Sequence, residues 1–436
     1  MIKRIKISGY KSLADLEVEL QPLAVLFGPN AAGKSNFLDA LQLLSRTATS
    51  RTLKEAFDPP YRGKPLESLT FGPNGIRGLR EKDSATFTIE ADVVLSRAVI
   101  DAVDRQIREM RRTKAAEDAP PSENGGQSFI RERYLRYRIE IEILPKSGIL
   151  RVSDEYLAPL NSKGQQKGGR NPFLDETEGR LHLRMEGQGH PTYYDRNLDH
   201  TVLSLPLYPP YYPHVVAMRQ ELASWSFFYF EPRERMRAPN PVKEVRHIGL
   251  MGEELAAFLN TLKAMDEPQF RAVEKALRMI IPSVTAIEVD VNDLGEVELR
   301  LREGTIPVPA RVLSEGTLRT LGLLALGGVK DPPALLGFEE PENGIHPRRL
   351  RLIAELLKTQ ATADTQLIVT THSPVLLDLI PDQSLYVCRK ADGRTEIKPF
   401  SEYGGLFRSI GIDSGLDDQL ADLTPSDRLM RGDFDA

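Results

Sequence analysis

Residues 28–35 restrict the fold of this chain more than any other stretch. They read GPNAAGKS and match the pattern GxxxxGK[ST] of a phosphate-binding loop. The apolar residues 23–27 precede the loop, and apolar residues recur at helical spacing over 37–44. Main-chain N–H groups of such a loop, together with the N-terminus of the following helix, attract phosphate. The residues that we predict to bind nucleotide here are Asn30, Gly33, Lys34, Ser35 and Asn36.

Two of these residues have specific chemistry. Lys34 is expected to reach the β- and γ-phosphates, and the hydroxyl of Ser35 is expected to bind Mg²⁺. The motif therefore predicts ATP or a similar nucleotide as ligand, with Mg²⁺ as cofactor.

The composition is that of an ordinary globular protein. The chain has 436 residues, of which 41% are hydrophobic, and this length allows two or three domain-sized units. A net charge of -5 disfavours a protein that coats DNA. The single cysteine, Cys388, excludes an intramolecular disulfide and fits a reducing compartment. Since no signal peptide and no apolar run of about 18 residues is present, we expect a cytoplasmic protein that does not contact membranes.

The N-terminal half alternates between strand patterns and polar stretches. Three strands are predicted within residues 2–27, and the third delivers the phosphate loop. Further strands are predicted at 85–95, 134–144 and 148–160, the last two forming an antiparallel hairpin. The remaining segments are a helix at 98–115, a loop at 116–128, and a region at 160–215 that is rich in Gly and Pro and is predicted to be irregular.

The C-terminal half begins with helices and returns to strands. Amphipathic helices are predicted from residue 251 to Pro282, followed by a hairpin around residues 293–295. Residues 333–340 and 365–374 read as buried strands separated by an amphipathic helix at 348–359. This order predicts a parallel βαβ unit.

Four polar motifs lie at the ends of these predicted elements. LSEGTLR (313–319) places Ser314 and Gly316 at a helix start, where an anion is favoured. LLGFEEP (335–341) ends an apolar strand in two carboxylates, Glu339 for Mg²⁺ and Glu340 as a general base. ENGIHP (342–347) forms a turn, and TTHSP (370–374) places His372 where it would sense a γ-phosphate. Paired carboxylates are usually solvated, but a pair that ends an apolar strand before a proline indicates a site.

With these motifs in this order, the chain resembles ATP-binding-cassette ATPases of the branch that includes RecF, the SMC proteins and the overcoming-lysogenization-defect nucleases. It is most similar to compact AAA-family ATPases of bacterial antiphage gene sets, which have neither a coiled-coil arm nor a Toprim domain. The resemblance implies an α/β P-loop head with a mixed sheet, flanking helices, an antiparallel β subdomain and a helical lobe. The implied assignments are Walker A for Lys34 and Ser35, the signature motif for Ser314 and Gly316, Walker B for Glu339 and Glu340, the D-loop for Asn343, and the switch for His372.

The resemblance also implies an assembly and a division of the chain. Ser314 and Gly316 of one subunit would close over ATP held by Lys34 of another, in a head-to-tail dimer or higher even oligomer. Residues 1–230 would form the first part of the head, 231–330 the helical lobe, and 331–436 the second part with an acidic tail. Insertions are expected at about 98–130 and 160–215.

Some positions depart from the family or stay open. Glu339 stands where the wider class has Asp, and no Gln has the strand context and order of a glutamine loop. Lys11 is either a nucleotide contact or a surface lysine, and Arg319 is either functional or a helix-surface charge. His346 is interpreted as a brace for its turn.

The leading functional hypothesis is an ATP-driven conformational switch. The residues after His372 end in an acidic stretch without a Toprim-like sheet, so we expect a nuclease or toxin effector on a separate chain, in antiphage defence. The alternative is a RecF-like clamp that binds DNA, although basic runs such as 105–114 and 131–138 are more typical of solvated faces. A transporter subunit is disfavoured by LSEGT in place of LSGGQ, and a metabolic kinase would not need the signature motif or His372.

Overall fold

The computed structural model describes residues 1–111, 128–187, 190–327, 332–404 and 424–434. Contacts between Cα atoms divide the chain into two compact units, each made of separate stretches of sequence. The first unit contains residues 1–21, 35–225 and 390–397, and the second contains residues 22–34, 226–389 and 398–436. The phosphate loop up to Lys34 therefore belongs to the second unit.

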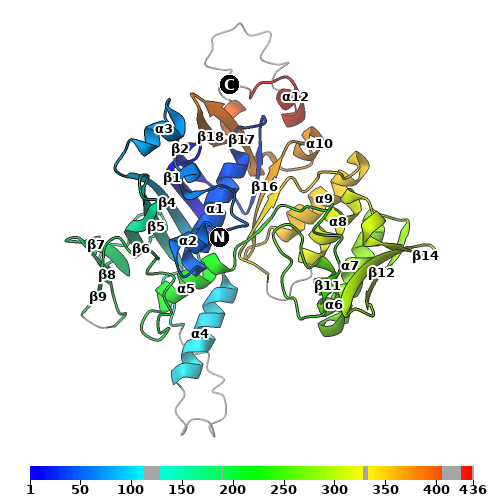
Figure 1. Cartoon of the computed structure of the whole chain (residues 1–436), viewed down its shortest axis with the longest axis horizontal. Helices are drawn as coiled ribbons and strands as arrows, with labels where there is room; N and C mark the ends of the chain where they lie inside the picture. Colours follow the sequence, from blue (N-terminus) through cyan, green and yellow to red (C-terminus); the bar gives the residue numbers. More distant parts are fainter. Residues whose placement is uncertain (112–127, 188–189, 328–331, 405–423, 435–436) are drawn as a thin grey trace. The chain divides into compact units, whose positions relative to one another are not determined.

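The first unit is built on an antiparallel sheet in the order β2-β1-β4-β5-β6-β7-β8-β9 (Figure 1). Apolar residues alternate with polar ones along the long strands, so one face is buried, as Ile5 on β1 and Ile139 and Ile141 on β5 illustrate. The strands are β1 (Ile2–Tyr10), β2 (Leu13–Glu19), β4 (Ala85–Val94), β5 (Tyr134–Leu144), β6 (Ile149–Pro159), β7 (Leu174–Thr177), β8 (Arg180–Leu183) and β9 (Thr192–Asp195).

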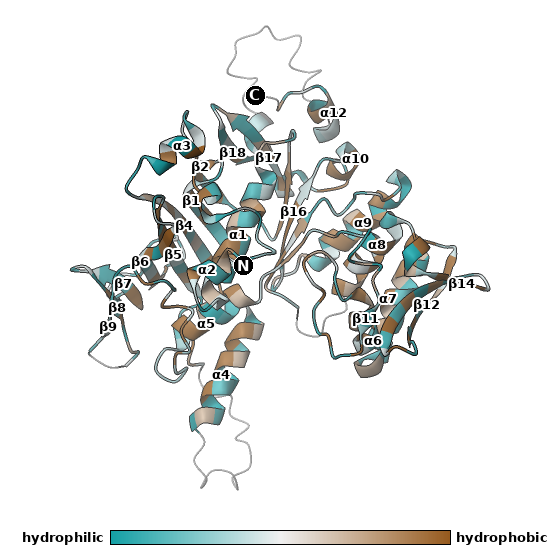
Figure 2. Ribbon diagram, viewed as in Figure 1, coloured by the Kyte–Doolittle hydropathy of each residue, from teal (hydrophilic) through white to brown (hydrophobic). Residues whose placement is uncertain are grey.

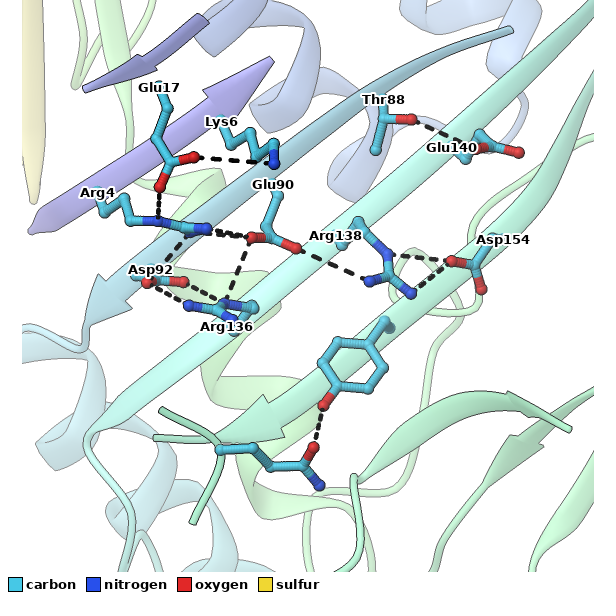
Figure 3. Close-up of polar contacts among 12 residues, drawn as sticks. Arg4, Lys6, Glu17, Thr88, Glu90, Asp92, Arg136, Arg138, Glu140 and Asp154 are labelled. Carbon is cyan, nitrogen blue, oxygen red and sulfur yellow. Dashed lines mark hydrogen bonds and ion pairs between the residues drawn. The ribbon is translucent and has the colours of Figure 1, made fainter. Parts of the chain in front are cut away.

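The other face of the long strands carries charges that pair between neighbouring strands (Figure 3). Arg4 on β1 contacts Glu90 on β4 at 2.8 Å, and Arg136 on β5 donates hydrogen bonds of 2.6 and 2.7 Å to Asp92 on β4. Asp92 is only 1% exposed and also contacts Arg4 at 3.4 Å, so losing both cations would leave a buried charge without compensation. These pairs join β1, β4 and β5 in one register.

Helices of the first unit include one whose amphipathic pattern is clear in Figure 2. On α4, Val99, Val103 and Ile107 recur every three or four residues and are buried. The predicted helix at 98–115 is confirmed as far as Arg111, whereas residues 112–127, with most of the predicted loop, lie outside the described residues. The helices are α1 (Lys34–Thr49), α2 (Leu53–Ala56), η1 (Pro65–Ser68), α3 (Gly75–Arg80), α4 (Arg97–Arg111) and α5 (Pro213–Ala223).

The prediction that residues 160–215 are irregular is wrong in part. Three four-residue strands, β7, β8 and β9, extend the antiparallel sheet within this region, and α5 begins at Pro213. Strands of this length are too short to show alternation in a sequence. The two residues between β7 and β8, Glu178 and Gly179, both have positive φ, of 53° and 79°. The hairpin cannot be recognised from the sequence, because a glutamate occupies the first of these two positions, where Asn, Asp or Gly is the usual signal.

The sheet that carries the phosphate loop has the order β10-β15-β16-β3-β17-β18, and its strands from β10 to β17 lie mainly in the second unit. From β10 to β17 the neighbours are parallel, and Thr371 at the end of β16 lies opposite Phe27 at the end of β3. The carboxyl ends of β3, β15 and β16 thus lie at one edge, where ligands bind in sheets of this kind. The strands are β3 (Leu23–Phe27), β10 (Ser226–Phe228), β15 (Leu335–Glu339), β16 (Gln366–Thr371), β17 (Leu385–Ala391) and β18 (Arg394–Pro399).

The predicted βαβ unit and the predicted hairpin of this half are both confirmed. Helix α9 (Pro347–Gln360) connects the parallel strands β15 and β16, and β12 pairs antiparallel with β13. A hydrophobic core that includes Val25, Phe338 and Leu321 unites the sheet with the helices. The remaining elements are β11 (Asn240–Pro241), α6 (Leu255–Met265), α7 (Glu267–Ile280), β12 (Val284–Val291), β13 (Glu296–Glu303), β14 (Ile306–Pro309), η3 (Ala310–Val312), α8 (Glu315–Leu326), α10 (Pro374–Leu377), η4 (Asp382–Ser384), η5 (Phe400–Gly404) and α12 (Pro425–Met430).

Candidate functional site

The phosphate loop is shaped by backbone conformations that few side chains tolerate. Gly28 has φ of 146°, and a Cβ added there would lie 1.9 Å from the carbonyl oxygen of Cys388 on β17. Gly33 has φ of 101°, and Ala31 is also left-handed, with φ of 62°. The glycines of the motif are therefore required by close packing and by positive φ, as the sequence pattern predicts. Cys388 is fully buried, and burial raises the pKa of its thiol to about 12, so it is a core residue.

Lys34 begins helix α1 and is held by the loop that precedes it. Its Nζ donates hydrogen bonds to the carbonyl oxygens of Gly28, at 2.8 Å, and Pro29, at 2.9 Å. The side chain is only 5% exposed, and burial lowers the pKa of Lys34. The nearby carboxylates of Glu339, Glu340 and Glu342 act in the opposite direction and favour the charged form. The loop therefore presents a desolvated cation, whose attraction to phosphate is stronger than in water.

His372 follows β16 and lies between Lys34 and Glu340. Its Nδ1 is 3.5 Å from Lys34 Nζ, and its Nε2 is 3.1 Å from Glu340 Oε1. Burial and then the charge of Lys34 lower the pKa of His372 from its ordinary value of 6.5, which favours the neutral ring. A ring that donates from Nε2 and accepts at Nδ1 satisfies both contacts. The three residues thus form one chain of polar contacts from the phosphate loop to the predicted general base.

Glu340 is held in position by both its backbone and its side chain. Its φ of 48° is left-handed, which is unusual for a glutamate and is typical of strained functional turns. Its main-chain N–H donates to the carbonyl oxygen of Thr370 at 2.9 Å, and the side-chain amide of Asn343 donates to its Oε2. The carboxylate is thereby fixed on one side by His372 and on the other by Asn343. This arrangement suits a general base that orients a water molecule.

The predicted Mg²⁺ ligands fit the ion in their chemistry. Ser35 is the second residue of α1, and Glu339 is the last residue of β15, at the edge where the loops emerge. A hydroxyl and a carboxylate are oxygen donors of the kind that Mg²⁺ takes in phosphate sites, where phosphates and water complete the shell. Among the described residues, no group of three or more His, Cys, Asp or Glu side chains gathers as a self-sufficient metal site. The assignment of Mg²⁺ to Ser35 and Glu339 stays a prediction.

The signature motif forms the start of helix α8. Ser314 is the N-cap, and its hydroxyl oxygen accepts a hydrogen bond of 3.1 Å from the N–H of Thr317. A Cβ added at Gly316 would lie 2.0 Å from the carbonyl oxygen of Gly344, so the helix start packs directly on the turn that follows Glu340. No hydrogen bond or ion pair joins Ser314 to Lys34 or His372 within the part of the chain that the structure describes.

The open positions are clarified by their contacts. Lys11, in a left-handed conformation with φ of 45°, donates to Asp39 on α1 at 2.7 Å, so it is not a solvated lysine. The side-chain amide of Asn36 donates to Ser12 Oγ at 2.7 Å. Arg319 is half-buried, and its Nε has no hydrogen-bond partner among the described residues, unlike a solvated helix-surface charge.

Three further positions complete the account of the predicted and missed residues: Asn30, His346 and Glu342. Asn30 is exposed, and its nucleotide contact, like that of Asn36, stays a prediction. His346 is the N-cap of α9, accepting a 3.3 Å hydrogen bond from Arg348 N–H, which agrees with its interpretation as a brace. Sequence reasoning missed Glu342, which is buried beside His372. The signal that could have found it is its place three residues after Glu339, in the same turn as Asn343.

A family model described as "AAA domain, putative AbiEii toxin, Type IV TA system" matches residues 23–100 and 196–378, which is more than half of the chain. The chain belongs to this family. Both matched ranges carry site residues, Lys34 and Ser35 in the first, and the signature, Walker B and His372 motifs in the second.

Relatives of this AAA-domain protein include an OLD nuclease and a chromosome partition protein. An OLD nuclease from Thermus scotoductus is 21% identical over 400 residues, which are 89% of this chain and 62% of that protein. The chain therefore spans less than two thirds of that relative's length. A chromosome partition protein Smc from Desulfitobacterium hafniense is 36% identical over 78 residues, 17% of this chain and 6% of that protein. The predicted resemblance to the OLD and SMC type of ATPase is confirmed.

Solved structures with a similar backbone include SMC heads. One is an Smc head bound to the C-winged helix domain of ScpA, with a TM-score of 0.49 and 12% identity, covering 91% of this chain and 97% of that chain. Another is the SMC head domain from Thermotoga maritima, with a TM-score of 0.41 and 13% identity, covering 91% and 98%. The predicted fold class, a P-loop ATPase head, is confirmed by the loop, the parallel sheet and the family. No described helix of this AAA-domain protein has the length and apolar character needed to cross a membrane.

Proposed function

We propose that this protein is an ATP-hydrolysing switch that dimerises head-to-tail around ATP and regulates a separately encoded effector. The observation that carries the proposal is the contact chain from Lys34 through His372 to Glu340, which supplies a phosphate-binding cation, a neutral histidine and a fixed carboxylate. Ser314 and Gly316 form a second anion-binding feature at the start of α8. Among the described residues, no hydrogen bond or ion pair joins them to Lys34, His372 or Glu340. Two such half-sites suit a nucleotide held between two copies.

Each residue has a distinct part in the proposed reaction. Lys34 and the loop N–H groups bind the β- and γ-phosphates, and Ser35 and Glu339 would hold Mg²⁺, which would neutralise phosphate charge. Glu340 accepts a proton from the attacking water, while Asn343 and His372 keep its carboxylate in place. Ser314 and Gly316 of the second copy would close the site against bulk water.

Complementation between inactive subunits tests the composite site. Lys34→Ala and Ser314→Arg should each abolish ATP hydrolysis when present in every subunit. In a mixture, the mixed dimer has one site with both lesions and one site with neither, so about a quarter of the wild-type rate per subunit should return if dimers form at random. Absence of any recovery, with both variants folded and dimers exchanging, would show that each subunit hydrolyses ATP alone or not at all.

The effector is proposed to be a nuclease or toxin encoded beside this protein, acting in antiphage defence. The family name refers to a toxin system, and one relative is described as a nuclease. Co-expression with the neighbouring genes, affinity purification and a phage challenge test the idea. A protein that cleaves nucleic acid or protects cells by itself would contradict the need for a separate effector.

A DNA clamp is the second candidate, and one observation favours it. Arg105, Arg108 and Arg111 are exposed on α4, and Arg131 and Arg133 are exposed before β5 in the same unit. A clamp should bind duplex DNA more tightly with ATP, and its affinity should fall steeply as salt rises, because phosphate contacts release counterions. Binding of duplex DNA that ATP does not change would exclude the clamp.

A further inference from the structure

The carboxylate of Glu342 connects the turn after Glu340 to the strand that carries His372. Its Oε1 accepts a hydrogen bond from the hydroxyl of Thr371 at 2.5 Å and from the main-chain N–H of His372 at 3.2 Å. Thr371 is fully buried and its Oγ1 in turn accepts a hydrogen bond of 3.0 Å from the N–H of Ser373. One carboxylate oxygen therefore holds the last residue of β16 and the first residue after it.

Burial of the second carboxylate oxygen of Glu342 lowers the stability of the fold, and packing alone does not explain why it is buried. Glu342 is 7% exposed, and its Oε2 is buried without a hydrogen-bond partner among the described residues. Burial raises the pKa of Glu342, although the hydrogen bonds from Thr371 and His372 favour its charged form. An unsatisfied buried oxygen destabilises a fold, so such groups in native proteins call for a functional explanation.

The position of His372 supplies that explanation. Its ring nitrogens contact Lys34 and Glu340 on opposite sides, and a ring can do this only if its backbone is fixed in place and direction. The Glu342 carboxylate is the side-chain group that holds the His372 backbone among the described residues. Its negative charge also favours the charged form of Lys34 and of Arg319.

We propose that Glu342 is a positioning residue of the ATPase site, which fixes the His372 backbone so that its ring bridges Lys34 and Glu340. The inference rests on the proposed ATPase function. It also assigns different parts to the two acidic residues of the turn, since Glu340 faces the His372 ring and Glu342 holds its main chain.

The variants distinguish the effect of losing the hydrogen-bond acceptor of the Glu342 side chain from the effect of losing its negative charge. Glu342→Gln keeps an oxygen that accepts from Thr371 and His372, whereas Glu342→Ala removes it. Thr371→Ser keeps the hydroxyl, and Thr371→Val removes it with little change in shape. Glu355→Ala, on the exposed face of α9, is the control for loss of a glutamate.

Steady-state ATP hydrolysis is the first measurement. Misplacing a catalytic group by about 1 Å costs up to about 100-fold in rate, so Glu342→Ala should lower kcat by about 10–100-fold with the KM for ATP within about 3-fold. Glu342→Gln should retain kcat within about 3-fold. Glu342→Ala should cause little further loss in a His372→Ala background, because both changes remove the same interaction. Losses that multiply in the double variant would show that Glu342 does not act through His372.

The second measurement does not depend on hydrolysis. The imidazole ¹H–¹³C NMR signals of His372, assigned by their loss in His372→Ala, should shift in Glu342→Ala and Thr371→Val and stay near wild type in Glu342→Gln, Thr371→Ser and Glu355→Ala. Unchanged His372 signals in folded Glu342→Ala would overturn the inference even if the protein hydrolyses ATP. A wild-type protein without ATPase activity would refute the proposed function, while the NMR comparison would still decide whether Glu342 positions His372.

Discussion

The contact between Gly316 and Gly344 leads to a quantitative prediction for Gly316→Ala. A Cβ at residue 316 would lie 2.0 Å from the carbonyl oxygen of Gly344, 2.7 Å from its carbonyl carbon and 3.2 Å from the main-chain nitrogen of Ile345. All three atoms belong to the backbone, so no side chain can rotate away. An ordinary contact between carbon and oxygen is more than 3 Å, and the turn or the helix start must therefore move by about 1 Å.

Gly316→Ala is expected to lower both the stability of the protein and its kcat for ATP hydrolysis. Overpacking of this kind costs about 1–3 kcal/mol, and each kcal/mol lowers Tm by about 2–4 °C in a domain of 150–250 residues. A shift of about 1 Å in the turn after Glu340 also misplaces the proposed base and Asn343, which should reduce kcat by about 10–100-fold.

The end of the same helix offers a matched control. Gly327 follows α8, and among the described residues a Cβ there would meet only the Gln360 side chain at 3.3 Å and the Leu324 carbonyl oxygen at 3.4 Å. Gly327→Ala should keep Tm and kcat near wild type. Differential scanning calorimetry and a phosphate-release assay measure both quantities. If Gly316→Ala were as stable and as active as Gly327→Ala, the tight packing of the signature turn on the Gly344 turn would be refuted.

Other predictions concern nucleotide chemistry and pH. Lys34→Ala should abolish ATP binding in isothermal titration calorimetry, because the loop loses the cation that is predicted to bind phosphate, and retained affinity would remove Lys34 from the phosphate site. Glu340→Gln should bind ATP, trap the dimer in size-exclusion chromatography with light scattering and stop turnover, whereas hydrolysis at the wild-type rate would exclude it as the base. His372 has a lowered pKa, so ATPase activity should fall as pH drops below 6.5 toward that pKa, and His372→Ala should flatten this acid limb. Burial raises the pKa of Glu155 to about 7, so its folded form keeps a proton that the unfolded form loses above about 4.5; stability should decline from pH 4.5 to 7, and less so in Glu155→Gln, as urea unfolding would measure.

The motifs at the strand ends were predictable because they depend on local chemistry. The pattern GPNAAGKS demands glycine where the backbone is left-handed, and Gly33 has the positive φ that this implies. The strand alternation of β5 and β6 and the βαβ order around α9 follow from side-chain period alone. Short elements escaped prediction, as the β7–β8 hairpin with Glu178 in the left-handed region shows.

The partners of the site residues were not predictable. Lys11 lies in the turn after β1 and contacts Asp39, 28 residues away, a pairing that depends on how the first unit folds. Glu342 lies in the predicted motif, three residues after Glu339, but this place does not reveal its partners, because its role depends on Thr371 and His372, about 30 residues further along the chain.

By itself, the sequence determined that this protein has a P-loop, a parallel strand pair of which one strand ends at Glu339 and the other just before His372, and a helix that begins at the signature motif. Only the tertiary structure decided that His372 lies between Lys34 and Glu340, that Glu342 holds its backbone, and that Gly316 packs on Gly344. The physical reason is the separation of the interacting residues along the sequence. Periodicity, turn residues and phosphate loops depend on contiguous residues. Contacts between strand ends depend on the order and register of the strands in the sheet, which are determined by the packing of the whole core.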